Sequence, residues 1–208
     1  MAGNAGGQGS SGDQPKERDR RITDVGTLKA LAHPLRARLM RALTLARAAT
    51  ASQLAEQVDE AVSLVSYHLR KLAEHGLIEE AEPRSADGRE RWWQPASDGL
   101  SIHDEDFRDA PEKAAAHAAA SRLFFDQRSG MYRRYLDERA HWSPEWTTAA
   151  ESSESVLRLT AAELAELTAE LRALARRYQE LGRAADAAGD TEGRENVALH
   201  TDAFPFRT

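Results

Sequence analysis

Two short amphipathic stretches separated by only two residues constrain the fold of this chain most strongly. The first, "TASQLAEQV" at residues 50–58, begins with Thr50 followed three residues later by Gln53, which is the spacing of a capping box at a helix start. Asp59 and Glu60 form the turn, and a second helix is expected from about Ala61 to residue 74. The chain therefore places two short helices side by side here.

The second of these helices has two different faces. Its apolar residues recur at steps of three and four, which predicts a buried stripe of Val62, Val65, Leu69 and Leu72. At about 100° per residue, Tyr67 points nearly opposite that stripe. Around Tyr67 lie Ser63, Leu64, Arg70, Lys71 and Glu74, with Ser66 and His68 at the two boundaries. Hydroxyls, a phenol, a leucine and two cations can reach base edges, thymine methyls and phosphates. A solvated helix face is the alternative.

A hairpin with basic residues at its tip follows the second helix. Gly76 ends the helix, and "LIEEAEP" and "RERWWQP" then flank "RSADG", in which Asp87-Gly88 is a hairpin turn signal. Arg84, Arg89 and Arg91 cluster around this tip. Arginines there can enter a minor groove or bind phosphates. Two helices and a hairpin indicate a winged helix-turn-helix, although a helical hairpin alone is common in α domains.

The positive charge is local, because the whole chain has a net charge of −6. Residues 15–95 carry 14 Lys and Arg against 12 Asp and Glu, whereas residues 96–208 carry 14 against 21. Binding of a polyanion depends on the local field, so an acidic total does not exclude it. It argues only against a chain that coats polyanions indiscriminately.

Three segments of the first half resemble one family of bacterial regulators. "LKALAHPLRARLMRAL", "VSYHLRKLAEHGLIE" and "GRERWW" are similar to the winged helix-turn-helix of ArsR-like transcription regulators, especially the longer actinobacterial-type members with a C-terminal extension. The resemblance covers about residues 24–95. It implies binding of double-stranded DNA and a homodimer. One departure is Ala61, where the family often has Ser at the start of the recognition helix.

The second half predicts a dimerisation region. Residues 111–142 form a long expected helix that begins at a proline and carries the candidate dimer residues Phe124, Phe125, Met131, Tyr132, Tyr135 and Leu136. A further helix starts at Thr160, where Glu163 completes a capping box. Its apolar residues have heptad-like steps, which favours a partner helix or, alternatively, its own domain's sheet: Leu164, Leu167, Leu171, Leu174, Tyr178 and Leu181. Strands are expected at residues 155–159 and in "NVALHTDAFPF", paired in a small α+β unit.

The resulting expectation is a mainly α protein with small β elements. It has a disordered tail (1–21), a DNA-binding domain (22–95), an acidic linker (96–110) and a dimerisation and effector region (111–208). No secretory signal or membrane span is evident, and the chain lacks cysteine, so a cytoplasmic location is expected. A protein-interaction module that reuses the winged-helix fold is the alternative.

Metal binding and catalysis are not predicted. Metal-sensing ArsR-like proteins carry Asp-x-His and, ten residues on, His-x-x-Glu, whereas this chain has Asp104-x-Asp106 and His117-x-x-Ala120. No nucleophile–base arrangement, Gly-rich phosphate loop or HExxH motif occurs, so no catalytic residue or cofactor is assigned. Four tryptophans leave a small-molecule effector pocket as a hypothesis, with core packing as the alternative: Trp92, Trp93, Trp142 and Trp146.

Overall fold

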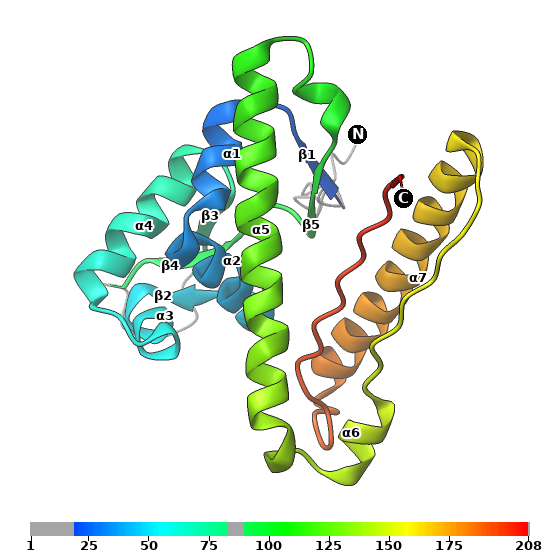
Figure 1. The fold of residues 1–208 in the computed structure, drawn as a ribbon. Coiled ribbons are helices and arrows are strands. Elements are labelled where there is room, and N and C mark those ends of the chain that lie inside the picture. Colours follow the sequence, from blue (N-terminus) through cyan, green and yellow to red (C-terminus); the bar gives the residue numbers. More distant parts are fainter. Residues whose placement is uncertain (1–18, 83–89, 208) are drawn as a thin grey trace, which may run out of the picture. The chain divides into compact units, whose positions relative to one another are not determined.

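The computed structural model describes residues 19–82 and 90–207 and is mainly helical, as predicted (Figure 1). The chain divides into two compact units, one ending at Ser129 and the other beginning at Gly130. In the part of the chain that is described, no helix is long and apolar enough to cross a membrane.

The first unit begins with a strand and two helices whose starts are set by local chemistry. Strand β1 (Asp19–Ile22) precedes α1 (Val25–Ala32), and Asp24 caps α1 by accepting a 2.7 Å hydrogen bond from the Thr27 amide. Helix α2 (Pro34–Ala46) begins at Pro34, where the missing N–H of proline leaves no helical bond unmade. Ile22 lies three residues before Val25, a spacing that also suits a helix, but it belongs to β1.

The predicted pair of short helices is present. Strand β2 (Ala49–Thr50) leads into α3 (Ala51–Val58), and Thr50 and Gln53 exchange both hydrogen bonds of the capping box. Asp59 ends α3 in the left-handed conformation with φ 52°, and α4 (Val62–Glu74) follows.

One hydrophobic core holds these helices together. Helix α4 packs against α1, α2 and α3. Its fully buried members include Val65 of α4 and Phe107, which follows the short helix η1 (Asp104–Asp106). They also include leucines from each of the four helices: Leu28, Leu39, Leu43, Leu54, Leu69 and Leu72.

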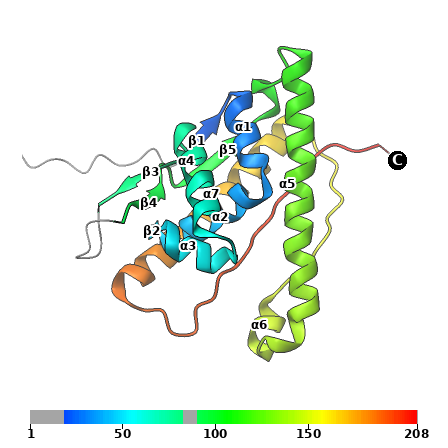
Figure 2. The same cartoon turned by 90° about the vertical axis from the view of Figure 1, so that its left-hand side faces the viewer.

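Two small sheets complete the first unit. Strands β3 (Ile78–Ala81) and β4 (Trp92–Pro95) are antiparallel, and β4 also pairs with β2, giving the order β2-β4-β3 (Figure 2). Strand β1 pairs in parallel with β5 (Gly99–Ile102). The sequence predicts that residues 19–21 belong to a disordered tail and that residues 99–102 belong to a linker. They are ordered strands because each supplies the other's hydrogen-bonding partner.

The remaining elements are helical. Helix α5 (Pro111–Glu138) is followed by η2 (Arg139–His141), α6 (Pro144–Ala149) and α7 (Ala161–Ala188). The Thr160–Glu163 capping box is confirmed. The prediction of two C-terminal strands is wrong. Residues 151–160 and 194–207 contain no strand in the structure, and their apolar side chains are exposed. An alternating pattern makes a strand only where its backbone pairs with the backbone of a second strand.

Two leucines of α4 provide a direct test of this packing. We expect Leu69→Ala to lower the free energy of unfolding by about 2–5 kcal/mol, because Leu69 is fully buried. Leu64→Ala should cost about 0.5 kcal/mol or less, because Leu64 is exposed on the same helix. Urea unfolding followed by circular dichroism measures both, and equal losses would contradict the assigned faces of α4.

Candidate nucleic-acid interface

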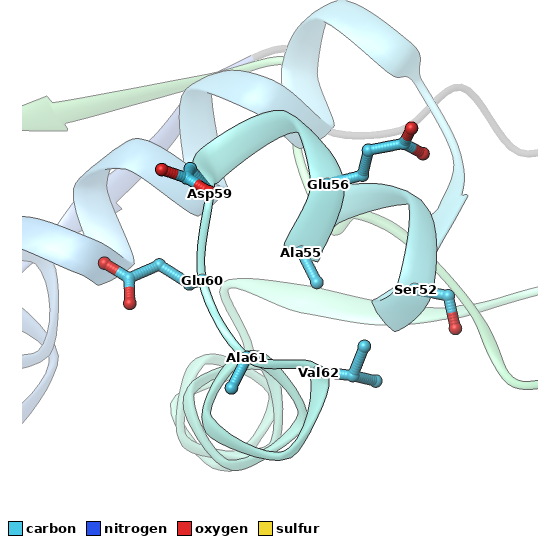
Figure 3. A pocket seen from close by; sticks show the side chains of 7 residues that line it. All are labelled: Ser52, Ala55, Glu56, Asp59, Glu60, Ala61 and Val62. Atoms are coloured by element: carbon cyan, nitrogen blue, oxygen red, sulfur yellow. The ribbon is translucent and has the colours of Figure 1, made fainter.

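The outward face of α4 carries the side chains that the sequence assigns to DNA contact. Tyr67 is 49% exposed, and Ser63, Leu64 and Arg70 are also exposed, whereas Ser66 and Lys71 are half-buried. Val65, Leu69 and Leu72 lie in the core as expected. Val62 does not, since it is 47% exposed. The turn places this first residue of α4 at the rim of a surface hollow rather than in the core (Figure 3).

The Tyr67 side chain has neighbours that hold its orientation. The ring packs edge-on against His68, with centroids 5.1 Å apart. The Lys71 ammonium lies 5.9 Å from the Tyr67 ring centroid and forms a 2.7 Å ion pair with Glu74. A phenol held in this way loses less freedom when it contacts a ligand.

The turn between α3 and α4 is acidic. Figure 3 shows the hollow at this turn, lined by Glu56, Asp59 and Glu60 together with small and apolar side chains. Arg38 of α2 stabilises the turn by donating to the Val58 carbonyl and pairing with Glu60 at 3.4 Å. The N-cap residue Ala61 makes no side-chain capping bond, as its identity predicts. Carboxylates here repel phosphates, so a polyanion is expected to contact the helix pair elsewhere.

A second hollow lies between the start of α3, the outward side of α4 and strand β4. It has a volume of about 400 Å³ and is lined by Ser52, Ser66, Arg70, Arg91 and Trp93, among others. Ser52 donates a 3.2 Å hydrogen bond to Glu90 at its edge. Two guanidinium groups and two hydroxyls are suitable partners for a sugar-phosphate backbone. Sequence reasoning missed Ser52, although its place in the first turn of α3 is a signal, because amides at helix starts attract anions.

The hairpin predicted after α4 is present as strands β3 and β4. Glu80 pairs with Trp93 in register, and Trp93 is buried while Trp92 is only half-buried, so the two tryptophans face opposite sides as expected. Arg91 extends along the hairpin, with its Nε 3.1 Å from a Glu80 carboxylate oxygen and its guanidinium carbon 5.6 Å from the Trp93 ring centroid. Arg84 and Arg89 lie outside the described residues.

Arg20 of β1 is bonded to the residues that follow α4, and its neighbour Arg21 is bonded to η1; sequence reasoning missed both. Arg20 donates to the carbonyl oxygens of Gly76 and, at 2.9 Å, of His75, the two residues that follow the end of α4. The neighbouring Arg21 binds both carboxylate oxygens of Asp106, at 2.7 and 2.8 Å, and this bond lowers the pKa of Asp106. No local pattern signals these contacts, because Arg20 lies 55 residues before His75.

Two histidines meet behind the outward face of α4. The rings of His68 and His33, the residue before α2, lie 4.6 Å apart, and each has a buried Nδ1 without a hydrogen-bond partner. Burial lowers the pKa of both, and the positive charge of Arg36 lowers them further. The charge of a protonated His33 also lowers the pKa of His68, and only Glu60 opposes these effects at His68. Both rings are therefore neutral at pH 7.

The candidate dimer residues of α5 fall into two groups. Phe124 packs against the core of its own unit. Phe125, Tyr132 and Leu136 are exposed, and Met131 and Tyr135 are half-buried. The exposed three follow each other at seven and four residues and so share one helix face.

The residues of the incomplete metal pattern partly come together. The His117 Nδ1 atom lies 3.4 Å from an Asp104 carboxylate oxygen, and the His117 ring stacks on Phe107. Within residues 19–82 and 90–207, no group of three histidine or carboxylate side chains is arranged to hold a metal ion.

Comparison with known proteins agrees with this geometry. Residues 31–81, which include α3 and α4, match the family model of a helix-turn-helix domain. The predicted resemblance is thus confirmed as far as a helix-turn-helix domain in this part of the chain. No curated protein sequence gives a match.

Several solved structures are similar to parts of the chain. One is described as a "possible transcriptional regulator for arsenical resistance", with 28% identity over 48% of this chain and 84% of that one, and a TM-score of 0.30. A MarR family transcription regulator has 18% identity, covers 76% and 79% of the two chains, and has a TM-score of 0.31. A mutant of ZitR from Lactococcus lactis has 16% identity, 70% and 73% coverage, and a TM-score of 0.28.

The buried histidine pair predicts a loss of stability in mild acid. As pH falls below about 6.5, unfolded histidine takes up a proton that the folded pair resists, so the unfolded state gains stability. We expect the melting temperature to fall between pH 7.5 and 5, and to fall less in His68→Leu. His141→Gln, which changes an exposed histidine, should keep the wild-type pH dependence. Identical pH profiles for the wild type and His68→Leu would disprove the role of the pair.

Proposed function

We propose that this protein is a cytoplasmic transcription regulator that binds double-stranded DNA in a sequence-specific manner. The observation that carries the proposal is the outward face of α4, within a helix-turn-helix domain. Its hydroxyls, phenol and cations match the donors, acceptors and phosphates of a major groove. Ser63, Leu64 and Tyr67 are proposed to contact base edges. The DNA backbone or a minor groove is proposed to be contacted by a second group of side chains: Ser66, Arg70 and Lys71 of α4 and the hairpin arginines Arg84, Arg89 and Arg91.

The proposed regulator acts as a homodimer on a near-palindromic site. Recognition helices about 34 Å apart can enter successive major grooves, and two half-sites select a genomic site better than one. The exposed face formed by Phe125, Tyr132 and Leu136 supports α5 as the dimer helix. We assign DNA binding to residues 22–95 and dimerisation, with any small-molecule effector control, to residues 111–208. Residues 96–110 connect them.

Selection from a pool of random duplexes tests this function directly. Duplexes of about 30 base pairs can hold two half-sites one helical turn apart. We expect the full chain to enrich a near-palindromic motif. Failure to enrich any motif would reject sequence-specific binding and would favour a protein-interaction module, which the exposed apolar side chains of α5 and α7 would also suit.

Two groups of variants separate specificity from affinity. Ser63→Ala and Tyr67→Phe should each weaken binding to the selected duplex by about 1–3 kcal/mol and change binding to a scrambled duplex little, because they remove base contacts. Arg89→Gln and Arg91→Gln should weaken both and reduce the salt slope by about one per lost phosphate contact. Fluorescence anisotropy across a salt series measures these effects.

The matched control for this series is Arg158→Gln, which removes an exposed arginine far from α4 in sequence. It should leave both affinities unchanged. If the hairpin variants weaken binding only to the selected duplex, then the hairpin recognises the base sequence and α4 serves only for docking. If the α4 variants have no effect, the assigned contacts are wrong.

The dimer contact has its own test on α5. Phe125→Glu and Leu136→Glu should each weaken the dimer, so that a larger share of the chain is monomeric at micromolar concentration, because a charge would be buried in the α5 contact. Leu123→Glu changes an exposed leucine on the opposite side of α5 and should remain dimeric. Sedimentation velocity distinguishes these results. A wild-type monomer, or equal effects of all three changes, would reject this interface.

A further inference from the structure

The apolar stripe of α7 is only partly covered by the described residues of the chain. Leu174, Tyr178 and Leu181 are 46%, 61% and 56% exposed, while Leu164, Leu167 and Leu171 are half-buried. A sheet of its own domain was one expected partner, but residues 130–207 contain no strand. An apolar stripe with heptad-like steps on one face of a helix favours another helix as its partner.

We propose that α7 pairs in antiparallel orientation with α7 of a second copy of this chain. The proposal deepens the homodimer of the proposed function and rests on it. The spacing of the stripe, three, four, three, four, three, reads the same in both directions. An antiparallel pair centred between residues 171 and 174 therefore places apolar residues opposite each other in every layer: Leu164 against Leu181, Leu167 against Tyr178, and Leu171 against Leu174.

The charged residues beside the stripe favour the same pairing. In this register, Glu170 of one copy lies next to Arg177 of the other, and the two-fold symmetry gives this pair twice. The Arg177 guanidinium already lies 5.2 Å from the Tyr178 ring centroid, at the flank of the stripe. A parallel pair would place Glu170 beside Ala175 and Arg177 beside Gly182, with no charge pair. The charges therefore select the antiparallel orientation.

The opposite flank leaves room for a close approach. Thr168, Ala175 and Gly182 follow each other at seven-residue steps along this side of the stripe. In the antiparallel register Thr168 lies beside Ala175 of the other copy. Small side chains at such positions let two helix backbones come close.

Introduced cysteines test the pairing, because the natural chain has none. A disulfide requires Cα atoms within about 7 Å. In the full-length double variant Leu164→Cys with Leu181→Cys, mild oxidation should yield covalent dimers. Each single variant should not, because a residue and its own copy would lie about 25 Å apart at a rise of about 1.5 Å per residue.

The matched control is the double variant Ala169→Cys with Arg176→Cys. These positions have the same register but lie on the opposite side of α7, so they should not cross-link. In the Leu164→Cys, Leu181→Cys background, Glu170→Arg should slow cross-linking about three- to tenfold, and adding Arg177→Glu should restore it.

Three outcomes would overturn the inference. Cross-linking of the single variants would show a parallel pair. A dimer by sedimentation that forms no cross-link in the 164/181 variant would show that the chain's own residues cover the stripe, and would leave the homodimer intact. A monomer by sedimentation would reject both the pairing and the homodimer, while the duplex selection would still report on DNA binding separately.

Discussion

Burial of one side of α4 determines which side chains the protein presents to its surroundings. The helix has 13 residues, and an isolated helix of that length is marginal in water. Its orientation therefore depends on Val65, Leu69 and Leu72 in the core. Because these three residues are fixed inward, Tyr67 and its neighbours are fixed outward. The contacts of Arg20 at one end of α4 and of Arg38 beside the other support the same orientation without adding apolar area.

Local patterns predicted the parts of the fold whose causes are local. The two capping boxes and the opposite faces of α4 each depend on residues within a few positions, and the structure confirms them. The errors arise where the outcome depends on distant residues. Val62 has the spacing of a core residue, yet it lies at the surface and is 47% exposed. Strands β1 and β5 form because each supplies the other's partner strand, whereas the alternating residues 197–203 belong to no strand.

The candidate interface shows the same division between local and distant causes. Side-chain angle alone identified Tyr67, Ser63 and Leu64 as outward-facing, because a helix repeats regularly. The same reasoning could not find Arg20 or the His33–His68 contact, since both depend on how separate helices and strands pack. Ser52 lies between these cases: its place at a helix start was visible, but the hollow beside it required the position of β4.

Two basic side chains near α4 are paired with carboxylates of the protein, and this pairing shapes how a polyanion would bind. Arg91 contacts Glu80, and Lys71 contacts Glu74, in each case at the surface. Exposed ion pairs contribute only about 0–1 kcal/mol, so exchanging a carboxylate for a phosphate costs little. While no polyanion is bound, the carboxylates of Glu80 and Glu74 lower the local positive field and so disfavour non-specific binding. Once the correct groove shape brings several phosphates close together, the exchanges occur at the same time, and counterion release adds to each of them. Such an arrangement favours a site that fits α4 over a duplex that offers only charge.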